Sequence, residues 1–268
     1  MDLELKGKRA LVTGSSTGIG SGIAKRLAAE GAQVVVHGRN AERARQMAEE
    51  IMAAGGQAKV ALGALDEDGE AAHVAEEALN AFGGIDILVN NAGGGTPDAP
   101  IAWLDVPADI WARNYNSNVI SAARMINALA PAMKERGWGR IVNLSSYAAQ
   151  ASSGGIPHYA ASKNAIVSMS FSLSKALAFT GVTVNTISPG LIMTNAAGPW
   201  LDKVAKSNNI PRDEAEEWVT SNMLRQTVKR MGQTHDVAYA AAFLCSPHAD
   251  FITGANIRVD GGASPASN

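Results

Sequence analysis

Two side chains in the second half of the chain, Tyr159 and Lys163, have a spacing that could support proton transfer. Residues four apart lie on one face of a helix, so we expect the phenol and the ammonium group to be neighbours. A nearby positive charge stabilises the phenolate, and the pair therefore predicts that the pKa of Tyr159 falls from about 10 towards neutral pH. Such a tyrosine could exchange a proton with the oxygen of a carbonyl or an alcohol.

A glycine-rich segment near the N-terminus has the features of a nucleotide site. The apolar run Arg9–Thr13 leads directly into Gly14, Ser15, Ser16, Thr17, Gly18, Ile19 and Gly20. Glycines permit a tight turn and a close approach of backbone N–H groups to a phosphate, at the positive end of the helix that follows. The spacing differs from the Gly-x-Gly-x-x-Gly of many dinucleotide folds, and an ordinary turn is the alternative.

The end of the second apolar run bears on which nucleotide is bound. It reads His37-Gly38-Arg39-Asn40 and contains no acidic residue. An acid at this position binds the 2′-hydroxyl of NAD, whereas a basic residue accommodates the 2′-phosphate of NADP. Arg39 could pair with that phosphate, or it could be a solvated residue at the start of a helix. The sequence favours NADP over NAD.

Short apolar runs alternate with helical patterns along the whole chain. The expected strands are Arg9–Thr13, Gln33–His37, Gln57–Ala61, Asp86–Asn90, Arg140–Ser145, Thr183–Ser188 and Ala255–Val259. The expected helices are Gly18–Glu30, Ala41–Ala54, Gly69–Phe82, Ala108–Lys134, Tyr159–Phe179 and Thr234–Ser246, the second beginning after Asn40 and ending at Gly55-Gly56. This order predicts an α/β fold, a doubly wound parallel sheet of about seven strands with helices on both faces. An eight-stranded α/β barrel is the alternative.

Composition excludes several classes of partner. A net charge of −2 on 268 residues gives no reason to expect nucleic acid or an anionic membrane. Cys245 is the only cysteine, so we expect a buried, inert thiol rather than a disulfide. The charged first residues and the short apolar runs predict a cytoplasmic protein. The histidines show no ligand spacing, so no metal site is expected; they are His37, His73, His158, His235 and His248.

The irregular stretch from Thr194 to Met231 contains Pro199 and Pro211 within a charged, partly helical pattern. We expect it to cover a site as a lid, with a surface excursion as the alternative. Segments expected to form walls of a substrate pocket are Thr96–Trp103, Tyr147–His158 and Met193–Trp200. Adjacent helix positions diverge by about 100°, so His158 is expected to face a neighbouring element rather than the site of Tyr159.

Taken together, the motifs resemble the short-chain dehydrogenase/reductase family over nearly the whole chain. The matching segments are Thr13-Gly14-x-x-x-Gly18-Ile19-Gly20, Asn90-Asn91-Ala92-Gly93, Asn118, Ser145-Ser146, Tyr159-x-x-x-Lys163, Ser188-Pro189-Gly190 and Asp260-Gly261-Gly262. Their order and spacing fit jointly, which makes the resemblance specific although each motif alone is not.

The resemblance implies roles for four side chains. Tyr159 corresponds to the catalytic acid and base, and Lys163 to the residue that lowers its pKa and binds the nicotinamide ribose. Ser146 corresponds to the residue that binds the substrate oxygen. Asn118 corresponds to the helix residue that holds a water in a proton relay; by composition alone, Asn114 and Asn116 are rivals.

The resemblance also implies contacts with the cofactor by Asn91, Ala92, Gly93, Pro189, Gly190, Ile192 and Thr194, while Asn90 braces the sheet. One segment departs from the family pattern. After the third strand the family often has an Asp-hydrophobic pair that holds the adenine, whereas this chain reads Ala64-Leu65-Asp66. The Leu65 backbone could still contact the adenine, but the carboxylate stands one place after Leu65 rather than before it.

The implied activity is NAD(P)-dependent interconversion of a ketone and a secondary alcohol, within one Rossmann domain spanning residues 1–268. The branch it most resembles favours a 3-oxoacyl-type ketone reductase, with hydroxysteroid, sugar-alcohol or other secondary alcohol dehydrogenases as alternatives. A dinucleotide-sensing regulator without turnover and a dehydratase or epimerase are more distant. Family membership also implies a homotetramer in which the helices Ala108–Lys134 and Tyr159–Phe179 pair between subunits.

Overall fold

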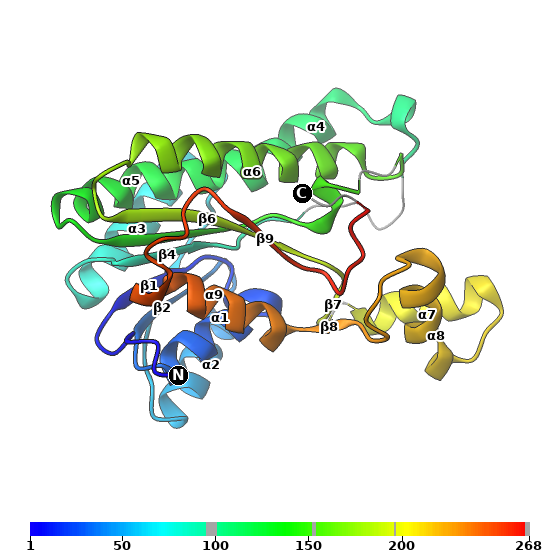
Figure 1. The fold of residues 1–268 in the computed structure, drawn as a ribbon, viewed down its shortest axis with the longest axis horizontal. Helices are drawn as coiled ribbons and strands as arrows, with labels where there is room; N and C mark the ends of the chain where they lie inside the picture. The colour runs from blue at the N-terminus through cyan, green and yellow to red at the C-terminus, as the bar shows by residue number, and fades with distance from the viewer. Residues whose placement is uncertain (95–100, 152–153, 196, 266–268) are drawn as a thin grey trace.

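The strands of the central sheet all run parallel (Figure 1). The computed structural model describes residues 1–94, 101–151, 154–195 and 197–265. The strands are β1 (Arg9–Val12), β2 (Gln33–Gly38), β3 (Gln57–Leu62), β4 (Ile87–Asn90), β5 (Gly139–Leu144), β6 (Val182–Pro189) and β9 (Asn256–Val259). Their order across the seven-stranded sheet is β3-β2-β1-β4-β5-β6-β9. This open order confirms the doubly wound prediction and excludes the barrel.

Helices cover both faces of the sheet (Figure 1). On one face lie α1 (Gly18–Ala29), α2 (Ala41–Ala53) and α9 (Thr234–Cys245); on the other lie α3 (Asp68–Phe82), α5 (Ser121–Glu135) and α6 (Pro157–Ala176). Helix α4 (Ala108–Tyr115) precedes α5, and single 3₁₀ turns occupy Trp103–Asp105, Tyr147–Ala149, Arg212–Glu214 and Pro247–Ala249. The second helix begins and ends as predicted, because the Asn40 side chain accepts a hydrogen bond from the Arg43 N–H and the chain leaves the helix through Gly55 at a φ of +87°.

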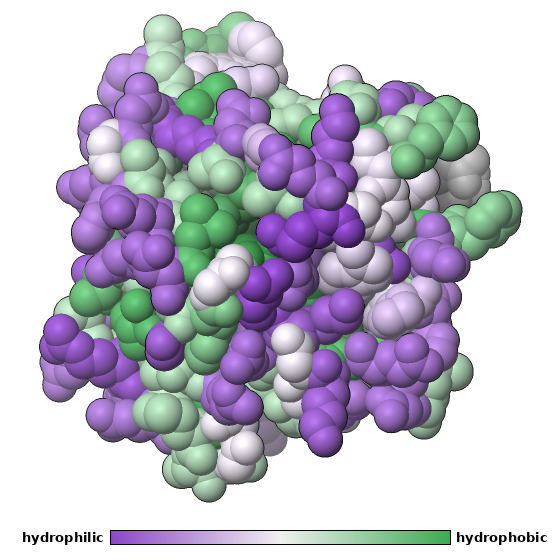
Figure 2. All heavy atoms as spheres, turned by 90° about the vertical axis from the view of Figure 1, so that its left-hand side faces the viewer, coloured by the Kyte–Doolittle hydropathy of each residue, from purple (hydrophilic) through white to green (hydrophobic). Residues whose placement is uncertain are grey.

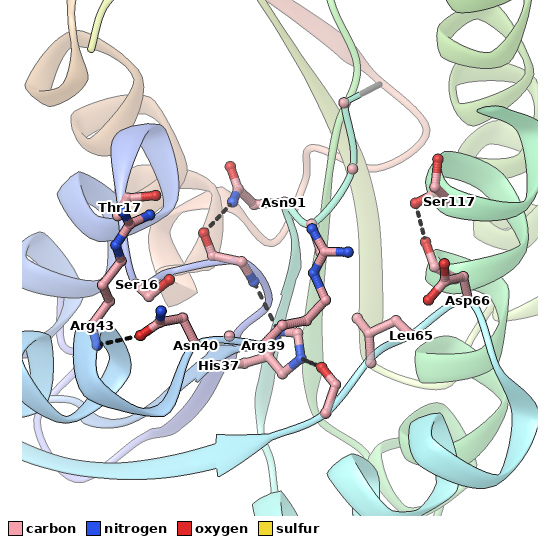
Figure 3. A pocket seen from close by; sticks show the side chains of 17 residues that line it. Ser16, Thr17, His37, Arg39, Asn40, Arg43, Leu65, Asp66, Asn91 and Ser117 are labelled. Carbon is pink, nitrogen blue, oxygen red and sulfur yellow. Dashed lines mark hydrogen bonds between the residues drawn. The ribbon is translucent and has the colours of Figure 1, made fainter. Parts of the chain in front are cut away.

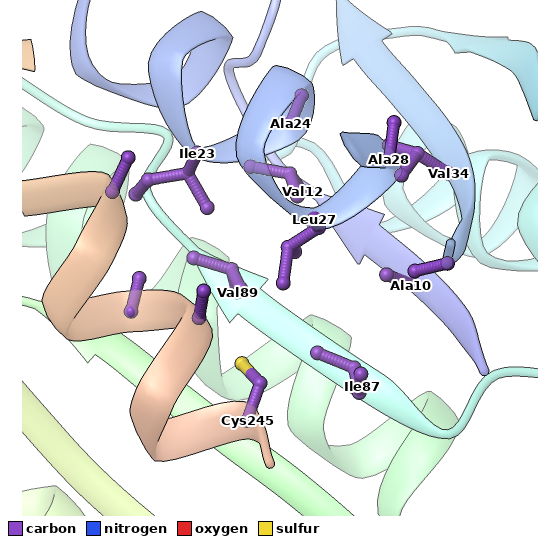
Figure 4. Packing of buried hydrophobic residues seen from close by; sticks show 14 of the residues in the cluster. Ala10, Val12, Ile23, Ala24, Leu27, Ala28, Val34, Ile87, Val89 and Cys245 are labelled. Atoms are coloured by element: carbon purple, nitrogen blue, oxygen red, sulfur yellow. The ribbon is translucent and has the colours of Figure 1, made fainter. Parts of the chain in front are cut away.

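Apolar side chains fill the layer between the sheet and the helices on each face. Between α1, α9 and the sheet, Ile23 and Leu27 pack against Val12 and Val89 (Figure 4). Each such side chain stabilises the fold by about 1.5–3 kcal/mol when fully buried. Cys245 is fully buried in this layer, and burial raises the pKa of its thiol to about 12. The expectation of a buried, inert thiol is confirmed.

The helix predicted over Ala108–Lys134 is interrupted by a π-helical turn at Asn116–Ile120, between α4 and α5. Short polar side chains compete for backbone acceptors there: Asn118 and Ser117 both donate to the Asn114 carbonyl. Side chains that bond to nearby carbonyls disturb the regular ladder, and π turns often occur where function requires it. The prediction of one regular helix is therefore wrong at this turn.

The stretch from Thr194 to Met231 leaves the sheet and forms a separate small layer beside the carboxyl ends of the strands (Figure 1). It contains α7 (Ala197–Asn208), α8 (Ala215–Trp218) and a π-helical turn at Val219–Met223. Its own apolar cluster includes Leu201, Val219 and Met231. At its base β7 (Ile192–Met193) pairs with β8 (Gly232–Gln233), a contact that the sequence did not predict.

The surface opposite α7 and α8 is mostly hydrophilic, with scattered apolar side chains (Figure 2). No helix in the described part of the chain is both long and apolar enough to cross a membrane. Within those same residues no group of three His, Cys, Asp or Glu side chains is placed to hold a metal ion.

Candidate active site

The strand order reverses between β1 and β4, and the chain segments that follow these two strands are joined by hydrogen bonds. The Thr13 hydroxyl accepts from the N–H groups of Asn91 (3.0 Å) and Ala92 (2.9 Å). The Asn91 amide in turn donates to the carbonyls of Thr13 (2.9 Å) and Gly14 (3.1 Å). Ligands of open α/β sheets bind in the crevice at such a reversal. Thr13 stands in the motif, but its bracing role follows only from these contacts.

A cavity of about 650 Å³ opens at this reversal (Figure 3). Of the residues predicted to contact a cofactor, it is lined by Gly14, Ser16, Thr17, Arg39, Leu65, Asn91, Ala92 and Gly93. Ser15, Gly18, Ile19 and Gly20 belong to the same loop but do not line it, and Ile19 packs partly against the apolar core. The structure therefore brings four expected segments of the nucleotide site around one cavity: the Gly14–Thr17 loop, Arg39, Leu65 and Asn91–Gly93.

Two glycines allow the backbone to approach closely at this cavity. Gly14 has a φ of +64°, and a Cβ there would stand 2.9 Å from the Ala92 Cα. Gly93 has a φ of +147°, and a Cβ there would stand 2.5 Å from the Asn118 Oδ1 and 3.6 Å from the Lys163 Nζ. Side chains at either position would fill the cavity's edge. The absence of Cβ atoms suits an elongated ligand lying along the ends of both strands.

The end of the cavity nearest β2 is basic. Arg39 and Arg43 both line it, beside Ser16 and Gly38. Arg39 is exposed, and among the described residues it makes no hydrogen bond or ion pair. Arg43 was not singled out from the sequence, although its place one helical turn after Arg39 could have suggested it. Two guanidinium groups and a serine hydroxyl are a suitable donor set for a phosphate.

The segment that departs from the family pattern is tied to the helices beside it. The Asn116 amide donates to the Asp66 carbonyl at 2.9 Å, and Arg124 donates to the Leu65 carbonyl at 3.2 Å and to Asn116 at 2.9 Å. Leu65 is buried, and both Leu65 and Asp66 line the cavity. Asn116 thus supports the loop after β3 and does not reach Tyr159, which removes it as a rival of Asn118.

Tyr159, Lys163 and Ser146 lie together where β5 ends and α6 begins. Tyr159 shares a side-chain hydrogen bond with Ser146. The Lys163 Nζ lies 5.7 Å from the centre of the Tyr159 ring and donates to the Leu144 carbonyl at 3.0 Å. Ser145 points elsewhere, as predicted, with its hydroxyl donating to the Lys163 carbonyl at 2.7 Å.

The expectation that Lys163 lowers the pKa of Tyr159 is wrong for this structure. Burial raises the pKa of the Tyr159 phenol; the hydrogen bond with Ser146 opposes this rise, and the nearby Tyr147 adds to it. Burial also lowers the pKa of Lys163 to about 8, and its ammonium group faces the ring and the Leu144 carbonyl. Helical spacing predicts that two side chains are neighbours, but it does not encode how deeply they are buried.

Asn118 links this group to the cavity through the π-helical turn. Its side chain accepts from the Gly94 N–H (3.0 Å) and donates to the carbonyls of Gly94 and Asn114 (both 2.9 Å). Asn114 is buried too, and its Oδ1 accepts from the Ser162 hydroxyl on α6 at 2.8 Å. Asn118 therefore lies against Gly93 and Gly94, whereas Asn114 supports it from the side of α6.

The remaining expected contacts lie farther along the carboxyl ends of the strands. Pro189 ends β6, and the Gly190 N–H donates to the Val259 carbonyl at 2.9 Å. Gly190 and Ile192 line a second cavity of about 360 Å³ rather than the first. Thr194 lies beside the nucleotide loop, since a Cβ on Gly18 would stand 3.8 Å from its methyl group. The four residues are thus not gathered around the first cavity.

His158 packs away from the catalytic group, as predicted. Its ring meets Trp111 edge-to-face at 6.2 Å, and Trp111 meets Trp103 in the same way at 5.8 Å. These side chains border the expected pocket walls. Parts of those walls, at residues 96–100, 152–153 and 196, lie outside the described residues.

The chain is similar to known oxidoreductases over nearly its whole length. A family model described as enoyl-(acyl carrier protein) reductase matches residues 14–264. The 7alpha-hydroxysteroid dehydrogenase of Escherichia coli strain K12 is 37% identical over 262 residues, covering 97% of this chain and 96% of that protein. The 3-oxoacyl-(acyl-carrier-protein) reductase of Vibrio cholerae is 34% identical over 260 residues, covering 97% and 98%.

Solved structures agree over the whole chain. A 7alpha-hydroxysteroid dehydrogenase in complex with NADH and 7-oxo-glycochenodeoxycholic acid superimposes with a TM-score of 0.86 at 36% identity, covering 100% of this chain and 98% of that one. The L-sorbose reductase of Gluconobacter frateurii in complex with NADPH and L-sorbose gives a TM-score of 0.93 at 30% identity, covering 99% and 100%. With this fold, this site and these relatives, the chain belongs to the short-chain dehydrogenase/reductase family.

Proposed function

We propose that the protein interconverts a ketone and a secondary alcohol with NADP(H), and that a 3-oxoacyl-type ketone is its first substrate class to test. The observation that carries the reaction is the partly buried Tyr159, which shares a hydrogen bond with Ser146 and lies beside Lys163. Relatives named for hydroxysteroids and for 3-oxoacyl groups, and a structural neighbour that binds a sugar, support the same reaction on different substrates.

We propose that the cavity takes the adenosine and pyrophosphate parts of the dinucleotide, and that the nicotinamide lies beyond it, past Gly93. Backbone N–H groups of Ser16, Thr17 and the start of α1 would hold the pyrophosphate, since those of Gly14 and Ser15 already donate to His37. Leu65 would contact the adenine. When bound, the nicotinamide supplies or accepts the hydride. Lys163 would donate to the nicotinamide ribose, since its Nζ lies at the open side of Gly93. Pro189, Gly190, Ile192 and Thr194 would contact the nicotinamide end.

The chain's own residues handle the proton. A raised pKa keeps the Tyr159 phenol protonated at neutral pH, which is the form that gives a proton to a carbonyl oxygen. Ser146 holds that oxygen in line through its hydroxyl, and both groups stabilise the negative charge that develops on it. Lys163 and Asn118 then reconnect the tyrosine to solvent, because Asn118 borders both Gly94 and the buried Asn114.

Removing the Tyr159 hydroxyl tests the reaction. Tyr159→Phe is expected to lower kcat about 10²–10⁴-fold, as for a lost general acid, with cofactor affinity nearly unchanged. Tyr239→Phe, at an exposed tyrosine on α9, is the matched control and should keep full activity. The measurement is nicotinamide absorbance with a panel of 3-oxoacyl esters, oxosteroids and ketoses. Near-full turnover by Tyr159→Phe contradicts the assignment, and no turnover of any substrate by the wild-type protein favours the sensing regulator.

Cofactor choice is tested at Arg39. We propose that Arg39, with Ser16 and Arg43, binds the 2′-phosphate of NADP, because these donors surround the basic end of the cavity. Arg39→Asp is expected to weaken NADPH at least tenfold by like-charge repulsion and to improve NADH, since a carboxylate binds a ribose 2′-hydroxyl. Steady-state KM values with both cofactors measure this. Equal loss for NADPH and NADH contradicts the phosphate site.

A further inference from the structure

His37, at the end of β2, lies against the nucleotide loop and takes no part in the proton chemistry proposed above. Its residue is only 3% exposed, and its ring lines the cofactor cavity (Figure 3). Burying a histidine costs free energy unless both ring nitrogens find hydrogen-bond partners within the protein. Its contacts are therefore informative.

The two ring nitrogens join two different loops. Nδ1 accepts from the Gly14 N–H at 2.9 Å, and Nε2 lies 3.1 Å from the Gly63 carbonyl. A backbone N–H can only donate and a carbonyl can only accept, so the ring is neutral with its proton on Nε2. One imidazole thus connects the loop after β1 with the loop after β3, and both glycines line the cavity.

The backbone of His37 fixes the next residue of the same loop. The His37 N–H donates to the Ser15 hydroxyl at 3.0 Å, and the Ser15 N–H donates to the His37 carbonyl at 2.9 Å. Burial lowers the pKa of the ring to about 4; the bond to Gly63 opposes this shift and Arg39 adds to it. Arg39, Arg43 and Asp66 are the charged side chains that line the same cavity. The neutral, bridging form is accordingly the one present near pH 7.

We propose that His37 is a positioning residue that holds the Gly14–Thr17 loop in the geometry that accepts the dinucleotide. This inference rests on the proposed NAD(P) site. A loop that is already ordered pays less entropy on binding, so its anchor raises affinity without touching the reacting atoms. Losing the ring acceptor would also leave the partly buried Gly14 N–H without this partner.

Two substitutions separate the two ring contacts. In His37→Asn the side-chain oxygen takes the place of Nδ1 and can still accept from Gly14, but the contact with Gly63 is lost. In His37→Gln the side-chain amide takes the place of Nε2 and can still donate to Gly63, but the acceptor for Gly14 is lost. Glutamine is closer to histidine in size, so a merely space-filling role predicts that His37→Gln is the milder change.

The anchoring role predicts the opposite: His37→Gln disturbs the Gly14–Thr17 loop more than His37→Asn does. In the cofactor-free protein, amide hydrogen exchange of the Gly14–Gly18 segment should rise about tenfold in His37→Gln and stay near wild type in His37→Asn. Calorimetric titration with NADPH should show a Kd raised about tenfold in His37→Gln and less than threefold in His37→Asn. KM for the cofactor should follow Kd, with kcat unchanged.

The possible outcomes distinguish a failure of the anchoring role of His37 from a failure of the proposed function. Equal exchange and equal Kd in both variants, or a milder effect of His37→Gln than of His37→Asn, overturn the anchoring role. A fall in kcat at unchanged KM overturns it too. Absence of dinucleotide binding to the wild-type protein overturns the proposed function, and selective loss of loop protection in His37→Gln still supports the anchor.

Discussion

Lys163, on α6, carries a buried ammonium group whose hydrogen-bond acceptor is the Leu144 carbonyl. No carboxylate in the described part of the chain forms an ion pair with it. Burial therefore lowers its pKa from 10.5 to about 8. A protonated lysine held in this way destabilises the folded state below pH 8 and is retained for its position beside Tyr159.

Replacing Lys163 should expose this conflict between stability and activity. A pKa shift of this size destabilises the folded wild-type protein by roughly 3 kcal/mol at neutral pH. A variant without the charge regains this free energy but loses the hydrogen bond to the Leu144 carbonyl, so the net gain is smaller. Lys163→Met is thus expected to raise the free energy of unfolding at pH 7 by about 1–2 kcal/mol while turnover falls at least 10²-fold.

The direction in which stability changes with pH follows from the linkage between proton binding and folding. Between pH 8 and 10.5 the unfolded chain binds the Lys163 proton more tightly than the folded one, so wild-type stability at this residue rises with pH. The advantage of Lys163→Met should therefore shrink as pH increases through this range. Urea unfolding at several pH values measures it, and a variant less stable than wild type at pH 7 contradicts the buried-charge argument.

At the scale of elements, helix α1 carries the nucleotide loop and is held against α9. A Cβ on Gly22 of α1 would stand 2.8 Å from the Thr234 Cβ at the start of α9. This close approach seats the first turn of α1, and so the positive end of the helix, at the cavity. The π-helical turn between α4 and α5 plays a comparable part by turning Asn118 towards Gly94.

A pair of Gly→Ala substitutions tests the helix contact. Alanine favours a helix over glycine by about 1 kcal/mol, so propensity alone predicts stabilisation at any helical glycine. At Gly22 the contact with Thr234 should outweigh this and destabilise the protein by about 1–3 kcal/mol, as overpacking does. At Gly69 of α3 a Cβ meets nothing within 4 Å, and Gly69→Ala should stabilise. Thermal unfolding compares them; stabilisation by Gly22→Ala would contradict the close packing.

For the whole molecule, several large apolar side chains are exposed on α4, α6 and the π-helical turn between α4 and α5. Phe171 on α6, Tyr115 on α4 and Ile120 on the π-helical turn are among them. They lie on the helices that the family resemblance pairs between subunits. We therefore retain the homotetramer as a proposal, with these side chains in a two-fold contact.

Charging that surface should weaken the assembly. If the wild-type protein is the proposed tetramer, Phe171→Glu is expected to shift it to smaller species by light scattering, because a carboxylate would be buried in the contact. Met52→Glu, at an exposed apolar side chain on α2, is the control and should leave the mass unchanged. A monomeric wild-type protein, or identical masses for both variants, contradicts the proposed contact.

The sequence predicted the strands closely because residues buried on both faces of a parallel sheet form continuous apolar runs. Eight of the seventeen residues that line the cavity were also expected from the sequence, because a glycine loop and the ends of apolar strands are local patterns. Arg43, Thr13 and His37 were missed as site residues, since their importance lies in contacts made across loops. The interruption at Asn116–Ile120 was missed because side-chain competition for the Asn114 carbonyl does not change the apolar pattern.

The sequence by itself determined the fold class, the family and the fact that Tyr159 and Lys163 are neighbours on one helix face, since all three depend on spacing along the chain. Only the tertiary structure decided the directions in which the pKa values of Tyr159 and Lys163 shift. Burial raises the pKa of Tyr159 and lowers that of Lys163, against the order that their charges alone predicted. Only the tertiary structure also showed that His37 connects the loops after β1 and β3. The physical reason is the same in both cases: desolvation and long-range hydrogen bonds arise from residues distant in sequence.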